Sequence, residues 1–379
     1  MNIMKLAVVS ESIAGENRVA TVPDAVRRLV TAGWEVYVQS GAGVYSQFTD
    51  AMYEQAGATV SPDVAATLSG ADIVAKVRPP TPEEVSNIPE GASVVSFMQP
   101  AADRDTIKAL MVRKVTAYSF DLLPRISRAQ SMDALSSQAT VSGYRAALVA
   151  ATILPKFFPM FMTAAGTVPP AKVMVMGAGV AGLQAIATAK RLGAQVRAYD
   201  VRTAAKEEVE SLGATFIQLE LEAQEGAGGY AKEQSEEFLA RQRELIGKEV
   251  AASDVVITTA AIPGRRAPLL VTREMVEMMS PGAVVVDMAA DSGGNCEVTE
   301  PGKDVVLNGV TVRGLSNPPS SMPEHASFLF ARNVASFLGL LVKDGEFAPD
   351  FDDEIVSGMC VTRDGLIPND AVASVVNAE

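Results

Sequence analysis

The stretch Lys172-Val-Met-Val-Met-Gly177-Ala-Gly179-Val-Ala-Gly182 joins a short apolar run to three spaced glycines. The apolar run predicts a buried strand, and the residues from Leu183 to Leu192 predict a helix that stops at Gly193. A second strand follows and ends in Asp200, close to the expected spacing of ~20 residues after the glycines. Strand, glycine-rich turn, helix and acidic residue, in that order, are typical of a domain that binds a dinucleotide.

Each part of this pattern has its own physical role. Gly177 permits the tight turn out of the strand, and Gly179 lacks a side chain, so the backbone can approach a pyrophosphate. Gly182 allows the helix to pack close to the strand. The N-terminus of the helix offers unpaired N–H groups and the positive end of the dipole to the phosphates, and Val180 and Ala181 are included in the predicted cofactor site. The alternative is a glycine-rich turn that binds no ligand.

The acidic residue at the end of the second strand selects among dinucleotides. Asp200 can accept hydrogen bonds from the hydroxyls of the adenosine ribose, and its negative charge would repel a 2′-phosphate. We therefore expect NAD(H) rather than NADP(H) as the cofactor. Arg202 weakens this preference because a guanidinium attracts phosphate. Val201, between the two charged residues, is included in the predicted cofactor site.

Two further turns are expected where the distant half of the cofactor passes. They are Thr258-Thr-Ala260-Ala-Ile-Pro263-Gly264 and Asp287-Met-Ala-Ala-Asp-Ser-Gly-Gly-Asn295. Ligands of open α/β sheets bind at the carboxyl ends of the strands, so both turns are candidate walls of a nicotinamide pocket. Ordinary loop structure without a ligand explains either turn equally well.

Short apolar runs alternate with amphipathic helical patterns over most of the chain. This alternation predicts an α/β protein with two Rossmann-like parallel-sheet domains that are linked by long helices. The expected strands are 6–10, 35–39, 73–77, 93–97 and 116–120 in the first series, and 172–176, 195–200, 215–218, 255–259 and 283–287 in the second. The expected helices of the first series are 23–32, 50–56 and 103–112.

The domain boundaries are expected at long helical runs. An alanine-rich run at 131–163 leaves the first domain, and a second run at 325–341 crosses back to it. We therefore predict one domain at residues 1–133 plus 325–379, and a dinucleotide-binding domain at 134–324.

The composition favours a soluble protein. The chain has 379 residues, 48% of them hydrophobic, and a net charge of -13, which argues against nucleic acid or an anionic membrane surface as a partner. The apolar stretch 146–165 has Pro155 and Lys156 at its centre, and a charge at mid-bilayer costs roughly 3 kcal/mol, so no membrane span is expected. Cys296 and Cys360 provide neither a disulfide framework nor a metal site, which fits the cytoplasm.

Several long segments resemble one protein family. Leu123-Pro-Arg125-Ile-Ser-Arg-Ala-Gln130-Ser-Met-Asp133-Ala-Leu-Ser136-Ser-Gln138 is similar to the signature loop of the NAD(H)-binding components of proton-translocating transhydrogenases. The segments 162–172, 177–191, 228–233 and 356–365 resemble the same family, so the likeness spans almost the whole chain. The wider family includes alanine dehydrogenase, which shares Glu16-Asn-Arg18-Val-Ala and Val74-Ala-Lys76-Val77.

The resemblance implies direct hydride transfer between NAD(H) on this chain and NADP(H) on a separate subunit, coupled to proton translocation through a membrane subunit. By matching positions, Arg125, Gln130 and Asp133 would hold the nicotinamide and its ribose, with Ser136 close by. Tyr230 would lie on a mobile loop that closes over the nucleotide. The family also implies a cytoplasmic homodimer without a membrane span of its own, peripheral to the inner membrane through its partner subunits.

Other interpretations remain open for these residues. Arg125, Arg128 and Asp133 could form a salt-bridge cluster that binds nothing, and the stretch 220–237 could be an exposed insertion rather than a lid. A binding module that senses dinucleotides without turnover is a further hypothesis, although the signature loop exceeds what a sensor needs.

Alanine dehydrogenase is the alternative enzyme, and it needs a group that transfers a proton, normally a histidine. Gln99 stands at the strand end that carries this histidine in alanine dehydrogenases, and an amide cannot transfer a proton. The only histidine, His325, lies in the returning segment. Arg18 and Lys76 could bind a carboxylate, but we prefer to interpret them as members of buried salt bridges within the first domain.

Overall fold

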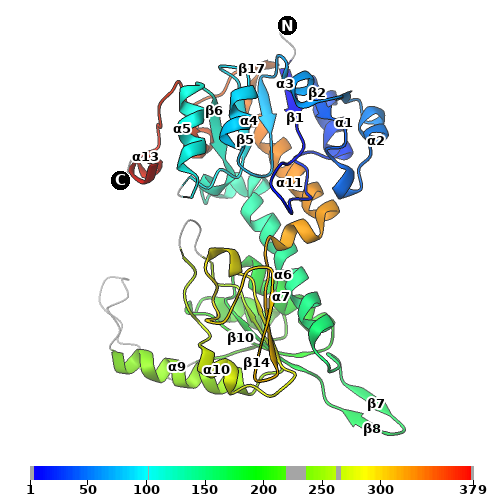
Figure 1. Cartoon of the computed structure of the whole chain (residues 1–379), viewed down its shortest axis with the longest axis vertical. Helices are drawn as coiled ribbons and strands as arrows, with labels where there is room; N and C mark the ends of the chain where they lie inside the picture. Colours follow the sequence, from blue (N-terminus) through cyan, green and yellow to red (C-terminus); the bar gives the residue numbers. More distant parts are fainter. Residues whose placement is uncertain (1–3, 101, 219–235, 262–265, 377–379) are drawn as a thin grey trace. The chain divides into compact units, whose positions relative to one another are not determined.

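The computed structural model describes residues 4–100, 102–218, 236–261 and 266–376, which divide into two compact units (Figure 1). Unit 1 consists of Met1–Gln138 and Pro319–Glu379, and unit 2 is Ala139–Pro318. The first residues of helix α6 (Ala134–Ile153) belong to unit 1 and the others to unit 2. The boundaries expected from the sequence, 133 and 325, were placed at the ends of helical runs and lie a few residues away from this division.

Unit 1 is built on one largely parallel sheet. Its strands are β1 (Met4–Val8), β2 (Trp34–Gln39), β3 (Thr59–Ser61), β4 (Ile73–Ala75), β5 (Ser93–Ser96), β6 (Thr116–Ser119) and β18 (Cys360–Thr362). They lie in the order β18-β6-β5-β4-β1-β2-β3, and only the pairing of β18 with β6 is antiparallel among the described strands. The order reverses between β1 and β4, which is the point where open α/β sheets form a crevice.

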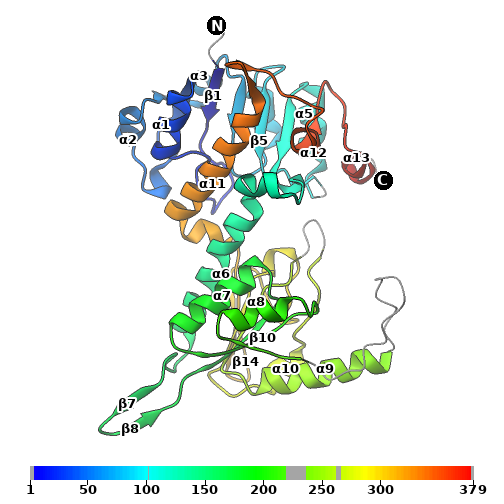
Figure 2. The same cartoon turned by 180° about the vertical axis from the view of Figure 1, so that it is seen from behind.

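Helices cover both faces of this sheet (Figures 1 and 2). Leu6 and Val8 of β1 contribute to one core and Ala7 to the other, because successive side chains of a strand point to opposite faces. The first core contains residues of α1 (Pro23–Thr31), α2 (Asp50–Gln55), α11 (Pro323–Leu338) and α12 (Glu354–Met359). The second contains residues of α3 (Val64–Leu68), α4 (Pro82–Asn87), α5 (Arg104–Val112) and α13 (Asp370–Val376).

The first five strands of unit 2 repeat the order found in unit 1, and the last two are interchanged. Its sheet comprises β9 (Lys172–Met176), β10 (Gln195–Tyr199), β11 (Thr215–Phe216), β12 (Val255–Thr258), β13 (Val284–Asp287), β14 (Asp304–Leu307) and β15 (Val310–Gly314). The order is β11-β10-β9-β12-β13-β15-β14, with β14 antiparallel to β15. The order reverses between β9 and β12, so the glycine-rich turn after β9 lies at the switch point where such sheets bind ligands.

Two helical layers enclose the second sheet. One face packs against α6, α7 (Val180–Arg191) and α8 (Ala205–Ser211), and the other against α9 (Glu236–Ala251) and α10 (Arg273–Glu277). Helices α6 and α7 approach each other so closely that a Cβ on Gly143 would lie 2.0 Å from the carbonyl oxygen of Ala181. Only glycine fits between these two helices at this position.

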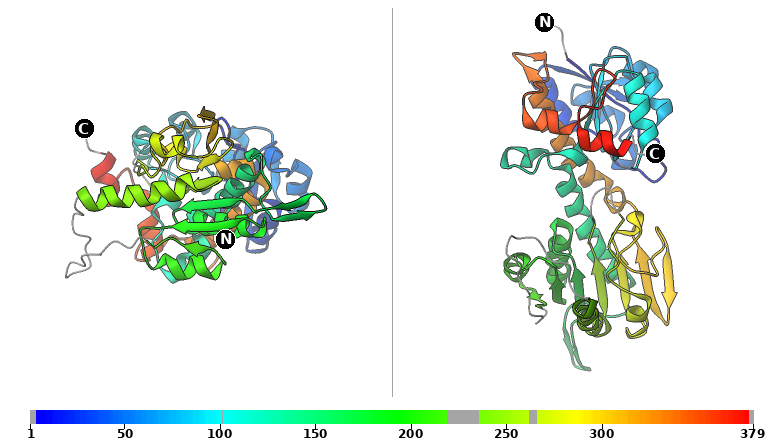
Figure 3. Two further views of the ribbon diagram at one scale, coloured as in Figure 1. Left: turned by 90° about the horizontal axis from the view of Figure 1, so that it is seen from below. Right: turned by 90° about the vertical axis from the view of Figure 1, so that its left-hand side faces the viewer.

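The segment after α6 differs from the expected helical run at 131–163. The helix ends at Ile153, shortly before Pro155, whose ring cannot continue it. An antiparallel hairpin of β7 (Phe161–Thr163) and β8 (Gly166–Val168) follows and projects from the rest of unit 2 (Figures 1 and 3). None of the helices in the described parts of the chain combines the length and apolar character that a bilayer crossing requires.

The predicted α/β fold class is confirmed, since parallel pairing dominates both sheets. The antiparallel strands β14 and β18 were not expected. Strand β14 is an edge strand with partly and fully exposed residues, so it lacks the continuous apolar run that marks a buried strand.

Candidate functional site

The turn after β9 brings two glycines into close contact with their surroundings. Gly177 has a φ of +101°, and a Cβ there would lie 2.6 Å from Thr259 Oγ1. A Cβ on Gly182 would lie 1.9 Å from the carbonyl oxygen of Gly177. Helix α7 can rest on the turn because Gly182 lacks a side chain, and Gly177 allows the turn itself to pass close to Thr259.

Gly179 has open space beside it instead. Its φ of -76° suits any residue, and a Cβ there would meet no atom within 4 Å. Gly179 is the N-cap of α7 and offers no side chain to the first N–H groups of the helix. Val180, the first helical residue, is 43% exposed. Unpaired N–H groups next to open space are what a pyrophosphate requires at a helix N-terminus.

Asp200 follows β10, and its side chain is hydrogen-bonded to the glycine-rich turn after β9. Its Oδ2 accepts a hydrogen bond from the Ala178 N–H at 2.7 Å, and its Oδ1 accepts one from the Arg202 N–H at 2.8 Å. The Arg202 guanidinium donates to both oxygens, at 3.1 and 3.2 Å. Partial burial raises the pKa of Asp200, but the hydrogen bonds from Arg202 and Ala178 outweigh this effect and the net shift is downward. Asp200 is therefore charged at neutral pH.

The exposed partner of this ion pair is Arg202. Its side chain is 62% exposed, whereas that of Asp200 is 7% exposed. A carboxylate has about four acceptor positions, and Ala178 and Arg202 together take up that number. Ribose hydroxyls could thus reach Asp200 by displacing the guanidinium. Val201 is 77% exposed beside this carboxylate and offers an apolar surface of the kind that lines nucleotide sites.

A buried carboxylate organises the carboxyl edge of β13. Asp287 is 0% exposed. It accepts hydrogen bonds from the N–H groups of Ala289, Asn295 and Cys296 and from the hydroxyls of Thr258 and Thr299. These oriented dipoles satisfy the buried charge and fix the turn that follows the strand.

Asn295 connects this turn to the one after β12. Its Nδ2 donates to the carbonyl oxygens of Ala260 and Pro268, each at 2.8 Å. The two predicted wall turns are therefore joined through a single buried amide. Pro263 and Gly264, which were predicted to belong to the same wall, lie outside the described residues, as does Tyr230.

In unit 1 the signature loop centres on Asp133, between η3 (Ser127–Met132) and α6. Its Oδ2 accepts hydrogen bonds from the Arg125 guanidinium at 2.7 Å and from the Ser136 hydroxyl at 2.6 Å. Its Oδ1 accepts one from the Ser136 N–H at 2.9 Å, the usual N-cap contact. The Asp133 side chain is 20% exposed and that of Arg125 63%. The carboxylate thus caps the helix and holds an accessible guanidinium in place.

Among the described residues, the side chains of two other members of the loop form no hydrogen bond with the Asp133 carboxylate, although the Asp133 N–H donates to the Gln130 carbonyl oxygen at 3.2 Å. Gln130 is exposed on η3. Arg128 pairs with Asp353, the N-cap of α12, at 2.6 Å. The loop therefore contains two separate ion pairs instead of one cluster of Arg125, Arg128 and Asp133.

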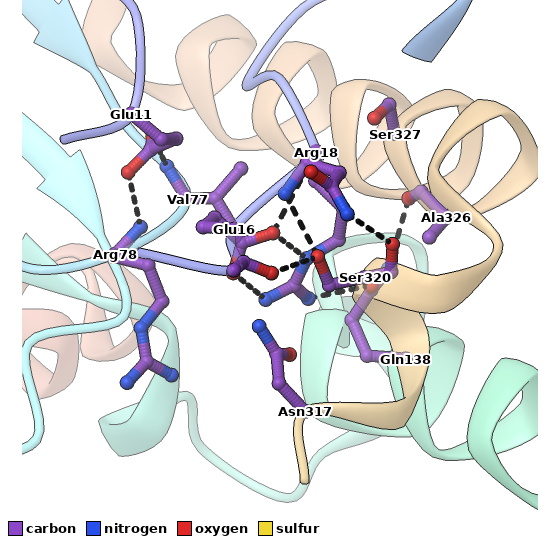
Figure 4. A network of polar contacts seen from close by, with 12 residues as sticks. Glu11, Glu16, Arg18, Val77, Arg78, Gln138, Asn317, Ser320, Ala326 and Ser327 are labelled. Carbon is purple, nitrogen blue, oxygen red and sulfur yellow. Dashed lines mark hydrogen bonds and ion pairs between the residues drawn. The ribbon is translucent and has the colours of Figure 1, made fainter. Parts of the chain in front are cut away.

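The other cations of unit 1 that the sequence singled out are in buried ion pairs, and Figure 4 shows that of Arg18. Arg18 donates to Glu16 through two nitrogens, at 2.7 and 2.6 Å, and to Gln138 at 2.9 Å. Lys76 lies 3.0 Å from a carboxylate oxygen of Glu84 and 3.6 Å from one of Glu11. Burial raises the pKa of Glu11, and Lys76 opposes this rise. Arg18 and Lys76 thus have internal carboxylate partners, as the preferred interpretation expected.

Comparison with known proteins places this geometry in a family. Residues 7–142 match the family "Alanine dehydrogenase/PNT, N-terminal domain", and residues 146–370 match its C-terminal counterpart. The chain belongs to the alanine dehydrogenase/PNT family. Within it, the chain is 52% identical to the first part of the NAD(P) transhydrogenase alpha subunit of Rhodospirillum rubrum, over 97% of this chain and 99% of the relative. It is 45% identical to the NAD(P) transhydrogenase alpha subunit of Haemophilus influenzae over 96% of this chain and 71% of that protein.

Solved structures agree with this assignment. A transhydrogenase from Sinorhizobium meliloti superposes with a TM-score of 0.88 at 45% identity, covering 96% of this chain and 99% of the other. An L-alanine dehydrogenase superposes with a TM-score of 0.82 at 25% identity, covering 98% and 99%. The alanine dehydrogenase of Halomonas elongata is 29% identical over 99% of this chain and 98% of its own. The predicted family, transhydrogenase alpha subunits with alanine dehydrogenase as a more distant relative, is confirmed.

The residue at the position of the histidine expected in alanine dehydrogenases argues against that branch of the family. Gln99 is exposed, has a φ of 45°, and donates its N–H to Asp121 at 2.9 Å. His325 is exposed in the first turn of α11. Neither residue combines a titrating side chain with the strand-end position that proton transfer to a substrate carbon requires.

The sequence analysis missed two residues behind the signature loop. Asn333 of α11 hydrogen-bonds to the loop, and Asp353 pairs with Arg128. An amide within the apolar run 325–341 was a signal for the first of them, because a buried polar side chain requires a partner.

Gly179→Ala should weaken NADH binding at least about tenfold without changing thermal stability, because the new methyl group takes only the open space that the pyrophosphate needs. Gly182→Ala should instead destabilise the fold by about 1–3 kcal/mol through overpacking. NADH fluorescence titration and thermal unfolding of both variants measure these effects. Equal loss of stability in the two variants would contradict the distinct roles of the glycines.

Asp200→Asn should lower the preference for NADH over NADPH by about tenfold or more, because the charge that repels a 2′-phosphate is gone and Arg202 loses its partner. Since the pKa of Asp200 is shifted downward, the preference of the unmodified chain should stay constant at neutral pH and above. Asp304→Asn, which breaks the comparable Asp–Arg pair with Arg313, is the matched control. An unchanged ratio of the two dissociation constants would remove Asp200 from the ribose site.

Proposed function

We propose that this chain is the NAD(H)-binding component of a proton-translocating transhydrogenase. In this role it holds NAD(H) for direct hydride transfer to or from NADP(H) on a partner subunit. The observation that carries the proposal is that one chain contains both a glycine-rich turn suited to a dinucleotide, in unit 2, and a hydrogen-bonded Arg125–Asp133–Ser136 cluster, in unit 1. The relatives that are named transhydrogenase alpha subunits support it.

The chemistry suits residues that bind and orient. A nicotinamide supplies the hydride or accepts it, so the protein need not provide a proton donor. Gly179 and the first N–H groups of α7 would bind the pyrophosphate, and Asp200 would select the ribose without a 2′-phosphate. Asp133 fixes the Arg125 guanidinium, which with Ser136 and Gln130 would hold the ring in a reactive orientation.

The partners follow from the same proposal. The NADP(H) site and the proton path would lie on an NADP(H)-binding subunit and a membrane subunit. This chain would then work on the cytoplasmic side, peripheral to the inner membrane through those subunits. Tyr230, Ala260, Pro263 and Gly264 complete the proposed NAD(H) site.

Alanine dehydrogenase is the second candidate, because the family includes it and because Arg18 and Lys76 are present. Three observations disfavour it. Gln99 occupies the position of the proton-transferring group, Arg18 is held by Glu16 and Gln138, and Lys76 is held by Glu84 and Glu11. A substrate carboxylate would have to displace these internal carboxylates from buried pairs, which is costly.

The deciding experiment is an assay of the chain in two arms. One arm contains NADH, pyruvate and ammonia. The other contains the NADP(H)-binding subunit, NADPH and the acetylpyridine analogue of NAD+. Turnover in the second arm alone supports the transhydrogenase. Turnover in the first arm would establish an alanine dehydrogenase and refute the argument from Gln99.

Asp133→Asn should slow hydride transfer in the second arm by up to about a hundredfold while NADH affinity stays the same, since a small displacement of the ring suffices for such a loss. Asparagine still caps α6, so the fold should persist. Single-turnover kinetics measure the rate of hydride transfer, and titration with NADH measures the affinity. Asp63→Asn, the same change at the N-cap of α3, is the control. Unfolding of the Asp133 variant would favour a purely structural ion pair.

The exposed hairpin supports the predicted homodimer. Phe157, Met160, Phe161, Met162 and Val168 are 56%, 58%, 42%, 76% and 40% exposed on and beside β7–β8. Apolar residues gathered on a projecting element of this kind mark an interaction surface. We propose that a second copy of the chain covers them.

Met162→Asp should convert the dimer to a monomer at micromolar concentration, because a charge cannot be buried in an apolar interface without a partner. Sedimentation velocity measures the change. Val306→Asp, at a residue of β14 that is 66% exposed, is the matched control and should leave the dimer intact. A wild-type chain that sediments as a monomer at this concentration would refute the proposal.

A further inference from the structure

The signature loop is fixed from behind by one amide on α11. Asn333 Nδ2 donates to the carbonyl oxygen of Ser131 at 2.9 Å, and the Ser137 hydroxyl donates to Asn333 Oδ1 at 2.8 Å. Ser131 belongs to η3 and Ser137 to the first turn of α6. The amide therefore bridges the two elements that meet at Asp133.

The surroundings of this amide make it an unusual choice for stability alone. Asn333 is 7% exposed, and its helix neighbours Phe330, Val334 and Phe337 belong to the apolar core of unit 1. A side-chain amide in such a core is unfavourable unless its donors and acceptor are used. Here both ends of the amide are used, and both bonds go to the loop.

Further polar contacts extend behind the first turn of α6. Gln138 Nε2 lies 3.2 Å from the Ser137 hydroxyl and donates to the carbonyl oxygen of Ala326 at 3.1 Å. Gln138 Oε1 accepts the bond from Arg18, which Glu16 holds in turn (Figure 4). Arg18 thus supports the start of α6, so its charge has a structural use without any bound carboxylate.

The start of the loop, at residues 124–128, is held by a different helix, α12. Arg128 pairs with Asp353, and a Cβ on Gly358 would lie 2.8 Å from Pro124 Cγ, so α12 rests directly on the start of the loop. With α12 restraining residues 124–128 and Asn333 restraining the stretch next to Asp133, the separation between Arg125 and Asp133 is set from both sides.

We propose that Asn333 is a positioning residue for hydride transfer, which acts through Asp133 and does not itself touch the nucleotide. This inference rests on the proposed function of the Arg125–Asp133–Ser136 cluster. Asn333 sets the position at which η3 ends, and thereby the position of the carboxylate that orients Arg125. Its loss would leave the glycine-rich turn of unit 2 unchanged. The rate of hydride transfer should therefore fall while the affinity for NADH stays nearly the same.

Asn333→Leu tests the proposal, because leucine has the same branching at Cγ, favours the helix and suits the apolar surroundings. Full-length chain with the NADP(H)-binding subunit should transfer hydride from NADPH to the acetylpyridine analogue at least about tenfold more slowly in a single turnover. The dissociation constant for NADH should stay within about twofold of that of the wild type, since its main contacts are elsewhere. Asn333→Ala serves as a second variant with the same expected split.

Ser327→Ala is the matched control on the same helix. Ser327 is also buried, and its hydroxyl accepts a hydrogen bond from the Val19 N–H at 3.0 Å and contacts Ser46 Oγ at 2.9 Å, away from the loop. This variant should lose some thermal stability and retain the wild-type transfer rate.

A double variant separates positioning from general stabilisation. If Asn333 acts through Asp133, Asn333→Leu combined with Asp133→Asn should be no slower than Asp133→Asn alone. Wild-type transfer in both Asn333 variants, or losses that multiply in the double variant, would overturn the inference while Asp133 keeps its role. A wild-type rate for Asp133→Asn itself would instead overturn the proposed cluster, and this inference with it.

Discussion

The contact between Gly182 and the carbonyl oxygen of Gly177 is the constraint on which the glycine-rich turn of unit 2 depends. It lets α7 start directly at the carboxyl edge of β9, where its first N–H groups face open space at Gly179. Gly143 is a second position where a side chain would not fit, because α6 lies against the start of α7 at Ala181. Two helix contacts without intervening side chains thus fix the direction in which the helix dipole points.

The two sheets share the order of their first five strands, but the residues at their switch points differ. In unit 2 the end of β9 leads into glycines and open space. In unit 1 the crevice region after β1 and β4 contains Lys76, which lies 3.6 Å from Glu11 and 3.0 Å from Glu84. Buried pairs of this kind contribute little net stability, but removal of one partner leaves an uncompensated charge, so such a region is difficult to convert to a new ligand site.

The sequence was sufficient for the features that depend on local patterns. The strands around 172–176 and 195–200 and the place of Asp200 at the end of the second of them follow from apolar periodicity and glycine spacing. The hairpin of β7 and β8, the edge strand β18 and the bonds of Asn333 could not be predicted, because each depends on pairing that the local pattern does not reveal. The same holds for Arg128, whose nearest acidic residue in sequence, Asp133, is not its partner.

The bonds of Asn333 also determine when the signature loop can become ordered during synthesis. Asn333 lies 202 residues after Ser131, and Asp353 lies 225 residues after Arg128. A ribosome would therefore complete all of unit 2 before the chain that anchors the loop emerges. Contacts of such long range form late in folding. The glycine-rich turn of unit 2 would thus form before the signature loop is fixed, so a product that ends before Asn333 would lack the bonds that hold the stretch next to Asp133 in place.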